Sequence, residues 1–299
     1  MLVLSSSKAK TRAVTPRTLL IGLICSLAGL PLGRAASAQA RPIEAAHPVA
    51  AVPRLRFRFD AGAALSAPAG VAADGALCVG TVDGYVHALA ADGTFLWSHS
   101  VHGAVTHRPV FAGEHWQVTT SSDHIYALRP DGTLSWVFKS LSAVSSELAA
   151  DANGTVYFAA ADHFLYGVSA HGAVSLRAFF GALAAGPSLG PDGAIWAENT
   201  AGMVLRVTGQ TVRRVARPPF QFGDPSALRD PEGHLWRGQS NGVLEYRATP
   251  QASPLLVPLT TTALLVPAWS AASRYAVLSS RAGLLFAIDP PASPGTPEP

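Results

Sequence analysis

The stretch Asp83-Gly84-Tyr85-Val86-His87-Ala88-Leu89 decides the fold, because the chain returns to it about every 40 residues. The next two copies read Ser-Asp-His-Ile-Tyr-Ala-Leu at residues 122–128 and Asp-His-Phe-Leu-Tyr-Gly-Val at residues 162–168. A fixed period of this length, made of short strand-like runs, is typical of a β-propeller in which each repeat forms one blade.

The phase of the repeat holds through six copies. The residue that opens the turn recurs at spacings of 39 to 41 as Gly84, Asp123, His163, Gly202, Gly242 and Gly283. Four residues later come Ala88, Ala127, Gly167, Arg206, Tyr246 and Ala287. A small residue beside a large aliphatic one suits a strand that packs on both faces, and this pattern decays in copies four and five.

Each copy contains four strand-like runs, and Asp-Gly pairs such as Asp92-Gly93 mark tight hairpin turns between them. We therefore expect an all-β fold over residues 53–290, a six-bladed β-propeller of four-stranded antiparallel blades. Six outer strands exist only if residues 54–59 are counted. The N-terminal strand should then complete the last blade, which closes the ring and removes its sheet edges.

The large aromatic residues follow the same phase. A tryptophan can act as a stacking platform for sugars or bases, but tryptophan repeated at one phase favours a core between blades. Cys78 occupies that phase, so we expect a buried thiol rather than a nucleophile. The other residues of this phase are Trp116, Tyr157, Trp196 and Trp236.

The ends of the chain do not read as blades. Residues 1–38 have the layout of a cleavable signal peptide, a basic stretch followed by an apolar run and then small residues. The alternative is a membrane anchor, but the apolar run is shorter than the ~20 residues that span a bilayer. Cys25 lacks the small preceding residue of a lipidation site. Residues 39–52 read as a linker, and residues 291–299 as a disordered tail.

Removal of the leader changes the charge of the chain. The sequence has 22 basic and 19 acidic residues; five basic residues precede the cut, which leaves 17 against 19, a net charge of −2. No basic stripe remains, so nucleic acid is not an expected partner. We expect a monomeric protein that is periplasmic or secreted from a bacterium and has no transmembrane segment after cleavage.

The unit Asp-Gly-x-Val-x-Ala-Leu-x-x-Asp-Gly-x-x-x-Trp, clearest at residues 83–97 and 122–136, resembles the pyrrolo-quinoline-quinone-like repeat. The resemblance implies either a quinoprotein dehydrogenase or a non-catalytic scaffold similar to the propeller lipoprotein of the outer-membrane assembly machine. The dehydrogenases carry a disulfide under the quinone, which the single cysteine of the mature chain excludes. The scaffold branch fits better, although this chain lacks its lipidation site and has fewer repeats.

Partner binding is expected on one face of the disc, where hairpin turns and loops between blades meet. The candidate residues are Asp83, His102, Arg108, Asp123, His124, Asp162 and His163. Imidazole and carboxylate groups on that face suit a zinc or manganese ion, but no short ligand spacing such as His-x-x-x-His occurs. We therefore expect no metal site, and we read the aspartates as turn residues.

The sequence contains no nucleophile motif and no phosphate-binding glycine loop. Glu147, Glu198 and Glu245 are scattered acids that we expect to reach the channel or a loop. The sequence thus predicts an exported, non-catalytic scaffold that binds an envelope or extracellular protein and needs no cofactor. The alternatives are a propeller enzyme of the quinoprotein or lyase kind and a glycan-binding module, each with a site at the central channel.

Overall fold

The computed structural model describes residues 52–215 and 227–291. The expected signal peptide, nearly all of the expected linker and all but the first residue of the expected tail lie outside the described residues. Within the described residues, no helix has the length and apolarity that a membrane crossing requires.

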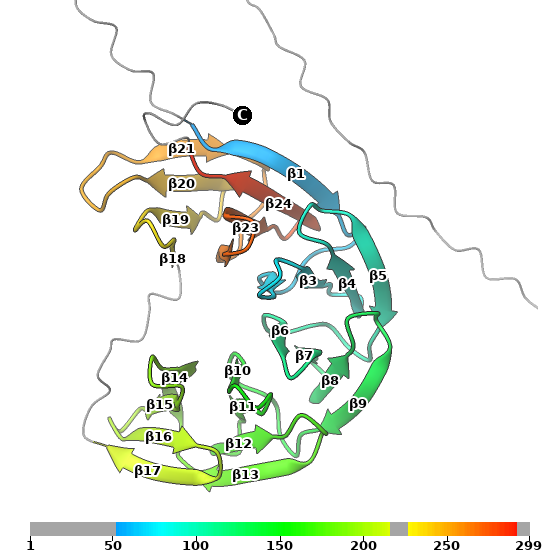
Figure 1. Ribbon diagram of the computed structural model, residues 1–299, viewed down its shortest axis with the longest axis vertical. Helices are drawn as coiled ribbons and strands as arrows, with labels where there is room; N and C mark the ends of the chain where they lie inside the picture. Colours follow the sequence, from blue (N-terminus) through cyan, green and yellow to red (C-terminus); the bar gives the residue numbers. More distant parts are fainter. Residues whose placement is uncertain (1–51, 216–226, 292–299) are drawn as a thin grey trace, which may run out of the picture.

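The described strands form six four-stranded antiparallel sheets, which confirms the six-bladed propeller (Figure 1). Blade 1 comprises β2 (Gly70–Val71), β3 (Leu77–Gly80), β4 (Tyr85–Leu89) and β5 (Phe95–Ser100). Blade 2 comprises β6 (Val110–Ala112), β7 (His115–Thr119), β8 (His124–Leu128) and β9 (Leu134–Lys139). Blade 3 comprises β10 (Ala149–Ala150), β11 (Val156–Ala159), β12 (Phe164–Val168) and β13 (Val174–Phe179).

The second half of the ring has the same order, from an inner strand outward. Blade 4 comprises β14 (Leu183–Leu189), β15 (Ile195–Asn199), β16 (Val204–Thr208) and β17 (Thr211–Val215). Blade 5 comprises β18 (Leu228–Arg229), β19 (Leu235–Gly238), β20 (Val243–Arg247) and β21 (Leu255–Pro258). Blade 6 comprises β22 (Ala268–Ser270), β23 (Tyr275–Ser279), β24 (Leu284–Asp289) and, from the other end of the chain, β1 (Arg54–Asp60).

The N-terminal strand completes the last blade, as the sequence predicts. Strand β1 pairs antiparallel with β24 from Arg54 opposite Asp289 to Asp60 opposite Leu284, with a bulge after Leu55. The side chain of Arg56 donates a hydrogen bond to Asp289 at 2.8 Å. One blade is thus built from both ends of the chain, which fastens blade 6 beside blade 1.

The core lies between successive blades. Phe59 and Tyr275 of blade 6 pack with Leu77 of blade 1, and Cys78 of blade 1 packs with Trp116 of blade 2. Similar apolar clusters join blade 2 to blade 3, blade 3 to blade 4 and blade 5 to blade 6. Trp116, Trp196 and Trp236 are all buried. These rings belong to the core, which removes them as stacking platforms for a glycan.

Outer strands also contact the next blade. The indole of Trp97 donates a hydrogen bond to the carbonyl of Pro130 at 2.6 Å, and that of Trp136 bonds to Ala170 at 2.8 Å. Each ring lies over the glycine of the next turn: a Cβ at Gly132 would come within 2.7 Å of Trp97. These glycine turns therefore serve both as hairpin turns and as packing surfaces for the preceding blade.

Burial raises the pKa of the Cys78 thiol well above its usual range. Since the thiolate is the reactive form, we expect Cys78 of the folded mature protein to resist iodoacetamide near pH 8 and to react fully once unfolded in denaturant. Mass spectrometry of the two samples checks this. Rapid alkylation of the folded protein would place Cys78 outside the interface between blades 1 and 2.

Candidate functional site: the turn face and the central cavity

The turns between the second and third strands share one face with the loops that leave each outer strand; we call this the turn face. The amide of Val101 donates to the carbonyl of Gly84 at 2.7 Å, and that of Ser140 to Asp123 at 2.8 Å. These bonds tie each loop to the turn of the same blade. The structure therefore places the loops and turns together, as the sequence predicts.

Two of the candidate histidines lie close together on the turn face. The rings of His102 and His124 are 6.1 Å apart, measured between their centroids. The hydroxyl of Ser122 donates to the carbonyl of His102 at 2.6 Å and lies 3.0 Å from Nδ1 of His124. The amide of His102 donates to the hydroxyl of Tyr126 at 3.0 Å. These contacts fix the loop of blade 1 to the turn of blade 2.

The candidate aspartates lie at equivalent turns of three successive blades. Asp83 is exposed and accepts a hydrogen bond from the Thr81 hydroxyl. Asp162 accepts a bond of 2.5 Å from Tyr166 and lies 3.8 Å from the guanidinium of Arg177. Burial of Tyr166 and its bond to Asp162 raise the pKa of the phenol. The contacts of these side chains stay within their own blades.

Asp123 and His163 occupy the position that is glycine in the other copies, and both have the left-handed backbone that this turn requires. Their φ angles are 64° and 68°, against 85° at Gly84. A left-handed conformation costs a residue with a Cβ roughly 1–2 kcal/mol, and less for aspartate. The repeat thus tolerates strain at these two turns.

His163→Gly should raise the free energy of unfolding by about 0.5–1 kcal/mol, because the side chain is exposed and only the backbone strain is relieved. Urea denaturation of the purified protein measures the change. The matched control is His171→Gly, which removes an exposed histidine outside the left-handed region. That change should destabilise the protein by a similar amount. If His163→Gly and His171→Gly destabilise the protein equally, the backbone of His163 is not strained.

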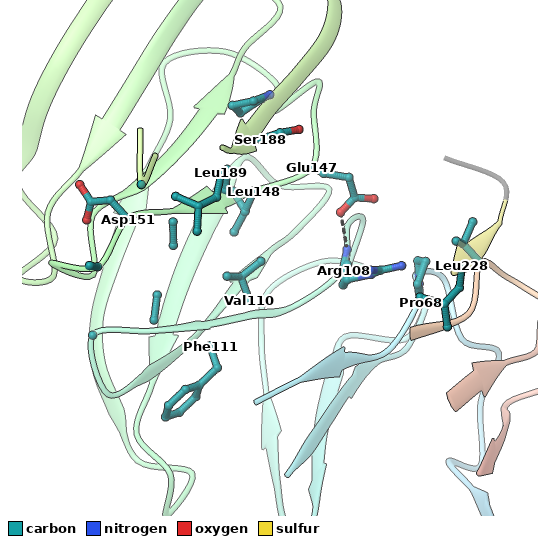
Figure 2. Close-up of a pocket in the computed structure, with 18 of the residues that line it drawn as sticks. Pro68, Arg108, Val110, Phe111, Glu147, Leu148, Asp151, Ser188, Leu189 and Leu228 are labelled. Atoms are coloured by element: carbon teal, nitrogen blue, oxygen red, sulfur yellow. Dashed lines mark hydrogen bonds between the residues drawn. The ribbon is translucent and has the colours of Figure 1, made fainter. Parts of the chain in front are cut away.

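Arg108 lies apart from the other candidates, in a cavity at the centre of the ring (Figure 2). The cavity measures about 920 Å³, and all six blades contribute residues to its wall, from Pro68 before β2 to Pro267 before β22. Its wall is largely apolar, with Glu147 and Asp151 among its polar residues. A cavity of this size and lining is typical of small-molecule sites.

Arg108 and Glu147 form the polar centre of this cavity. The carboxylate of Glu147 accepts the backbone amide of Arg108 at 3.0 Å (Figure 2), and the guanidinium of Arg108 reaches the carbonyl of Pro267 at 3.5 Å. Burial lowers the pKa of Arg108, while the charge of Glu147 opposes that shift. Burial also lowers the pKa of the neighbouring His107. Opposite charges side by side can bind a polar ligand.

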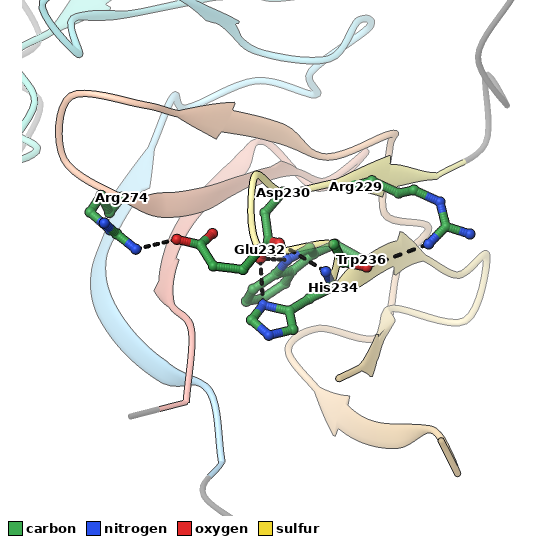
Figure 3. A network of polar contacts seen from close by, with 7 residues as sticks. Arg229, Asp230, Glu232, His234, Trp236 and Arg274 are labelled. Atoms are coloured by element: carbon green, nitrogen blue, oxygen red, sulfur yellow. Dashed lines mark hydrogen bonds and ion pairs between the residues drawn. The ribbon is translucent and has the colours of Figure 1, made fainter. Parts of the chain in front are cut away.

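The described residues contain one group of three metal-ligand side chains within 4.8 Å of one another: Asp230, Glu232 and His234 (Figure 3). This group lies at the turn between β18 and β19, on the face opposite the turn face. Asp230 accepts bonds from Nδ1 of His234 at 2.8 Å and from the indole of Trp236 at 3.0 Å. Glu232 forms an ion pair with Arg274. These groups already have partners, which indicates a structural network.

Sequence reasoning missed two apolar side chains of the turn face. Leu141 is 80% exposed and Phe179 is 68% exposed, where the outer strands of blades 2 and 3 end. The ring of Phe179 meets that of Phe164 edge to face at 5.4 Å, and Arg177 lies 4.0 Å above Phe164. Their signal in the sequence is a departure from the repeat, because blade 1 has His102 and Ser100 at these positions.

Comparison with known proteins matches the chain to a family model and to many solved structures. A family model described as "Outer membrane protein assembly factor BamB" matches residues 40–214. No curated protein matches the chain. Among solved structures, the crystal structure of BamB from Moraxella catarrhalis is 14% identical, and the alignment covers 81% of this chain and 94% of that one, with a TM-score of 0.38.

Proposed function

The chain belongs to the repeat-propeller family of the outer membrane protein assembly factor BamB, and we propose that it is an exported, non-catalytic scaffold. It binds another protein of the cell envelope through the turn face. The observation that carries this proposal is the pair of exposed apolar side chains, Leu141 and Phe179, on the turn face.

The turn face has the composition of a protein interface. Interface hot spots are rich in aromatic residues and arginine around an apolar centre. Leu141 and Phe179 supply the apolar area, while Phe164 meets Phe179 edge to face and Arg177 stacks on Phe164. The hydrogen bonds from Ser140 to Asp123 and from Phe180 to His163 hold the two loops on the rigid blades. A pre-organised surface of this kind binds at a low cost in conformational entropy.

The other candidate residues form the polar rim of this surface. His102, His124 and His163 lie on neighbouring turns and loops of blades 1 to 3, and Asp83 marks the corresponding turn of blade 1. We propose that they orient the partner and limit binding to the correct surface, as rim charges do in other complexes. Arg108 lies in the central cavity, so we leave it out of this contact.

The composition of the N-terminus supports export. Residues 1–38 have the order of a secretory signal, and the mature chain has one cysteine, in keeping with a fold that needs no disulfide. We propose that the mature protein is a periplasmic or secreted monomer. Fractionation of the source bacterium should recover it from the periplasm or the medium, with an N-terminus after Ala38 or Ala40.

The variant Leu141→Asp/Phe179→Asp should abolish partner capture, because it places two charges in the apolar centre of the surface. The tagged mature protein is incubated with envelope extract, the captured protein is identified and purified, and its affinity for both forms is measured by calorimetry. We expect the dissociation constant to rise by about tenfold or more.

The matched control is Leu256→Asp, which adds the same charge to a leucine that is 54% exposed on the outer strand of blade 5. It should bind the partner like the unmodified protein. Equal affinity of the double variant, or equal loss in the control, would place the partner elsewhere. Leu141, Phe179 and Leu256 are all exposed. Thermal denaturation should therefore show that the unmodified protein, the double variant and the control are all folded.

A further inference from the structure

One histidine is enclosed at the junction where the ring closes. His87 lies in β4 of blade 1, and its ring meets that of Phe59 in β1 at 5.9 Å between centroids. The rings of Tyr85 and Phe95, both from blade 1, lie 6.2 Å and 6.3 Å from it. Three aromatic rings therefore surround the imidazole, and the one that comes from blade 6 belongs to the N-terminal strand.

Neither ring nitrogen of His87 has a hydrogen-bond partner in the described part of the chain, although both nitrogens are shielded from solvent. A neutral imidazole has one donor and one acceptor, whereas the protonated ring has two donors and a positive charge. Burial of unpaired polar atoms is unfavourable, and burial of an unpaired charge is far more so. The closed junction thus accommodates the neutral ring and opposes the charged one.

Blade 1 compensates little for a charge on His87. Burial lowers the pKa of this imidazole, and the negative charge of Asp83 at the turn before β4 opposes that shift with a smaller effect. The carboxylate of Asp83 accepts its hydrogen bond from the hydroxyl of Thr81. The residues that pair with His87 are uncharged, Val79 on β3 and Ser98 on β5.

The strand that covers His87 directs its neighbouring charged side chains to the other face of blade 6. Phe59 belongs to the apolar cluster at the junction with blade 1, whereas Arg58 pairs with Phe286 of the cluster shared with blade 5. Asp60 lies on the same side as Arg58, because successive residues of a strand alternate between its two faces. Neither of these charges faces the imidazole.

The other charged or titratable groups of the blade 6 face already have partners. Arg56 pairs with Asp289 at 2.8 Å and lies 4.9 Å from the centre of the ring of Tyr275. The hydroxyl of Tyr275 donates to the carbonyl of Ala91 at 2.7 Å. Burial raises the pKa of this phenol, so it stays neutral where histidine titrates. The described residues of blade 6 therefore offer no partner for a charge on His87.

We propose that this junction is an acid-sensitive latch, in which a proton on His87 releases β1 from blade 6. Phe59 covers the imidazole from the blade 6 side, so departure of β1 admits the water that solvates the charge. The closed form binds fewer protons than the open form, because burial holds the pKa of His87 below its ordinary value of 6.5. The closed form is therefore favoured fully above that pH and loses stability as the pH falls below it. The latch does not depend on the function proposed for the turn face.

Hydrogen exchange of the full mature protein tests the latch. It is measured by mass spectrometry at about pH 7.5 and about pH 5, and each rate is divided by the intrinsic exchange rate at that pH. We expect protection of the β24 amides that pair with β1 to fall by about tenfold or more at the lower pH, since each pH unit can multiply the open population by up to about tenfold. Strand β12, on the other side of the ring, should keep its protection.

His87→Phe should remove this pH dependence, because the new ring fills the same space and cannot be charged. His87→Gln provides a second neutral side chain and should do the same. The repeat supports the first change, since the position of His87 holds an aromatic ring in three of the other five blades. The equivalent residues are Tyr126, Tyr166, Leu205, Glu245 and Phe286.

The matched control is His99→Phe, which changes a histidine of β5 that pairs with Val86 on the face toward blade 2. It should keep the pH dependence of the unmodified protein. The proposal is overturned if protection of β24 in the unmodified protein is the same at both pH values, or if both His87 variants lose protection as the unmodified protein does. Equal loss of protection in β12 also overturns it, because acid would then unfold the whole ring.

Discussion

Trp236→Ala is expected to lower the free energy of unfolding by about 3–5 kcal/mol, the range seen for large aromatic residues in cores. The Trp236 side chain is 0% exposed. It packs edge to face on Tyr246 at 4.8 Å and lies 6.3 Å from Trp269 across the junction of blades 5 and 6. Truncation leaves a cavity between two rigid sheets that cannot collapse freely.

The same change has a polar consequence. The indole of Trp236 donates to the buried carboxylate of Asp230, which also accepts from His234. The loss of this donor to the buried Asp230 carboxylate adds to the destabilisation that the cavity causes. Urea denaturation followed by tryptophan fluorescence measures the total. Leu141→Ala is the control, because an exposed leucine should change stability by less than about 0.5 kcal/mol. A loss below about 1 kcal/mol for Trp236→Ala would contradict the packing of blade 5 on blade 6.

Phe59→Asp is expected to detach the N-terminal strand and to destabilise the protein by about 4 kcal/mol or more. Phe59 is buried among residues of blades 6 and 1, including Leu65 and Leu89. A carboxylate at this position would be buried without a partner, which is among the most destabilising changes known. Detachment of β1 would also expose the edge of β24, and an unpaired edge promotes aggregation.

Hydrogen exchange locates this effect. In the unmodified protein, the amides of β24 that pair with β1 should exchange slowly. In Phe59→Asp they should exchange at least about tenfold faster, while β12, on the other side of the ring, stays protected. Arg58→Ala is the control, since its side chain is exposed on the same strand. Unchanged protection of β24 in Phe59→Asp would contradict closure of the ring by β1.

The repeat predicts the architecture because the same positions recur at a nearly constant spacing in all six copies. The spacing of turn positions such as Gly84 and Gly283 sets the number of blades, and the surplus strand at residues 54–59 determines how the last blade is completed. The phase that Cys78 and Trp236 share in the repeat also predicts that both are buried. All of these predictions follow from a period near 40, which a single sequence displays.

The site depends on information that periodicity does not contain. Leu141 lies in the loop after β9 and Phe179 is the last residue of β13, so both lie where the strand pattern ends, and their exposure depends on how the chain packs there. The direction of Arg108 into the cavity follows from the path of the chain into β6. His87 occupies an ordinary strand position of the sequence. Its meaning requires knowledge of which blade faces meet, since a strand pattern gives the face but not its neighbour.

The central claim is that the turn face of blades 2 and 3 binds an envelope protein, and crosslinking in living cells tests it most directly. A photoreactive amino acid is placed at position 141 or 179, and at position 256 as the control. We expect crosslinks from positions 141 and 179 to the same envelope protein, with none from position 256. Absence of crosslinks from positions 141 and 179, or the same product from position 256, would contradict it.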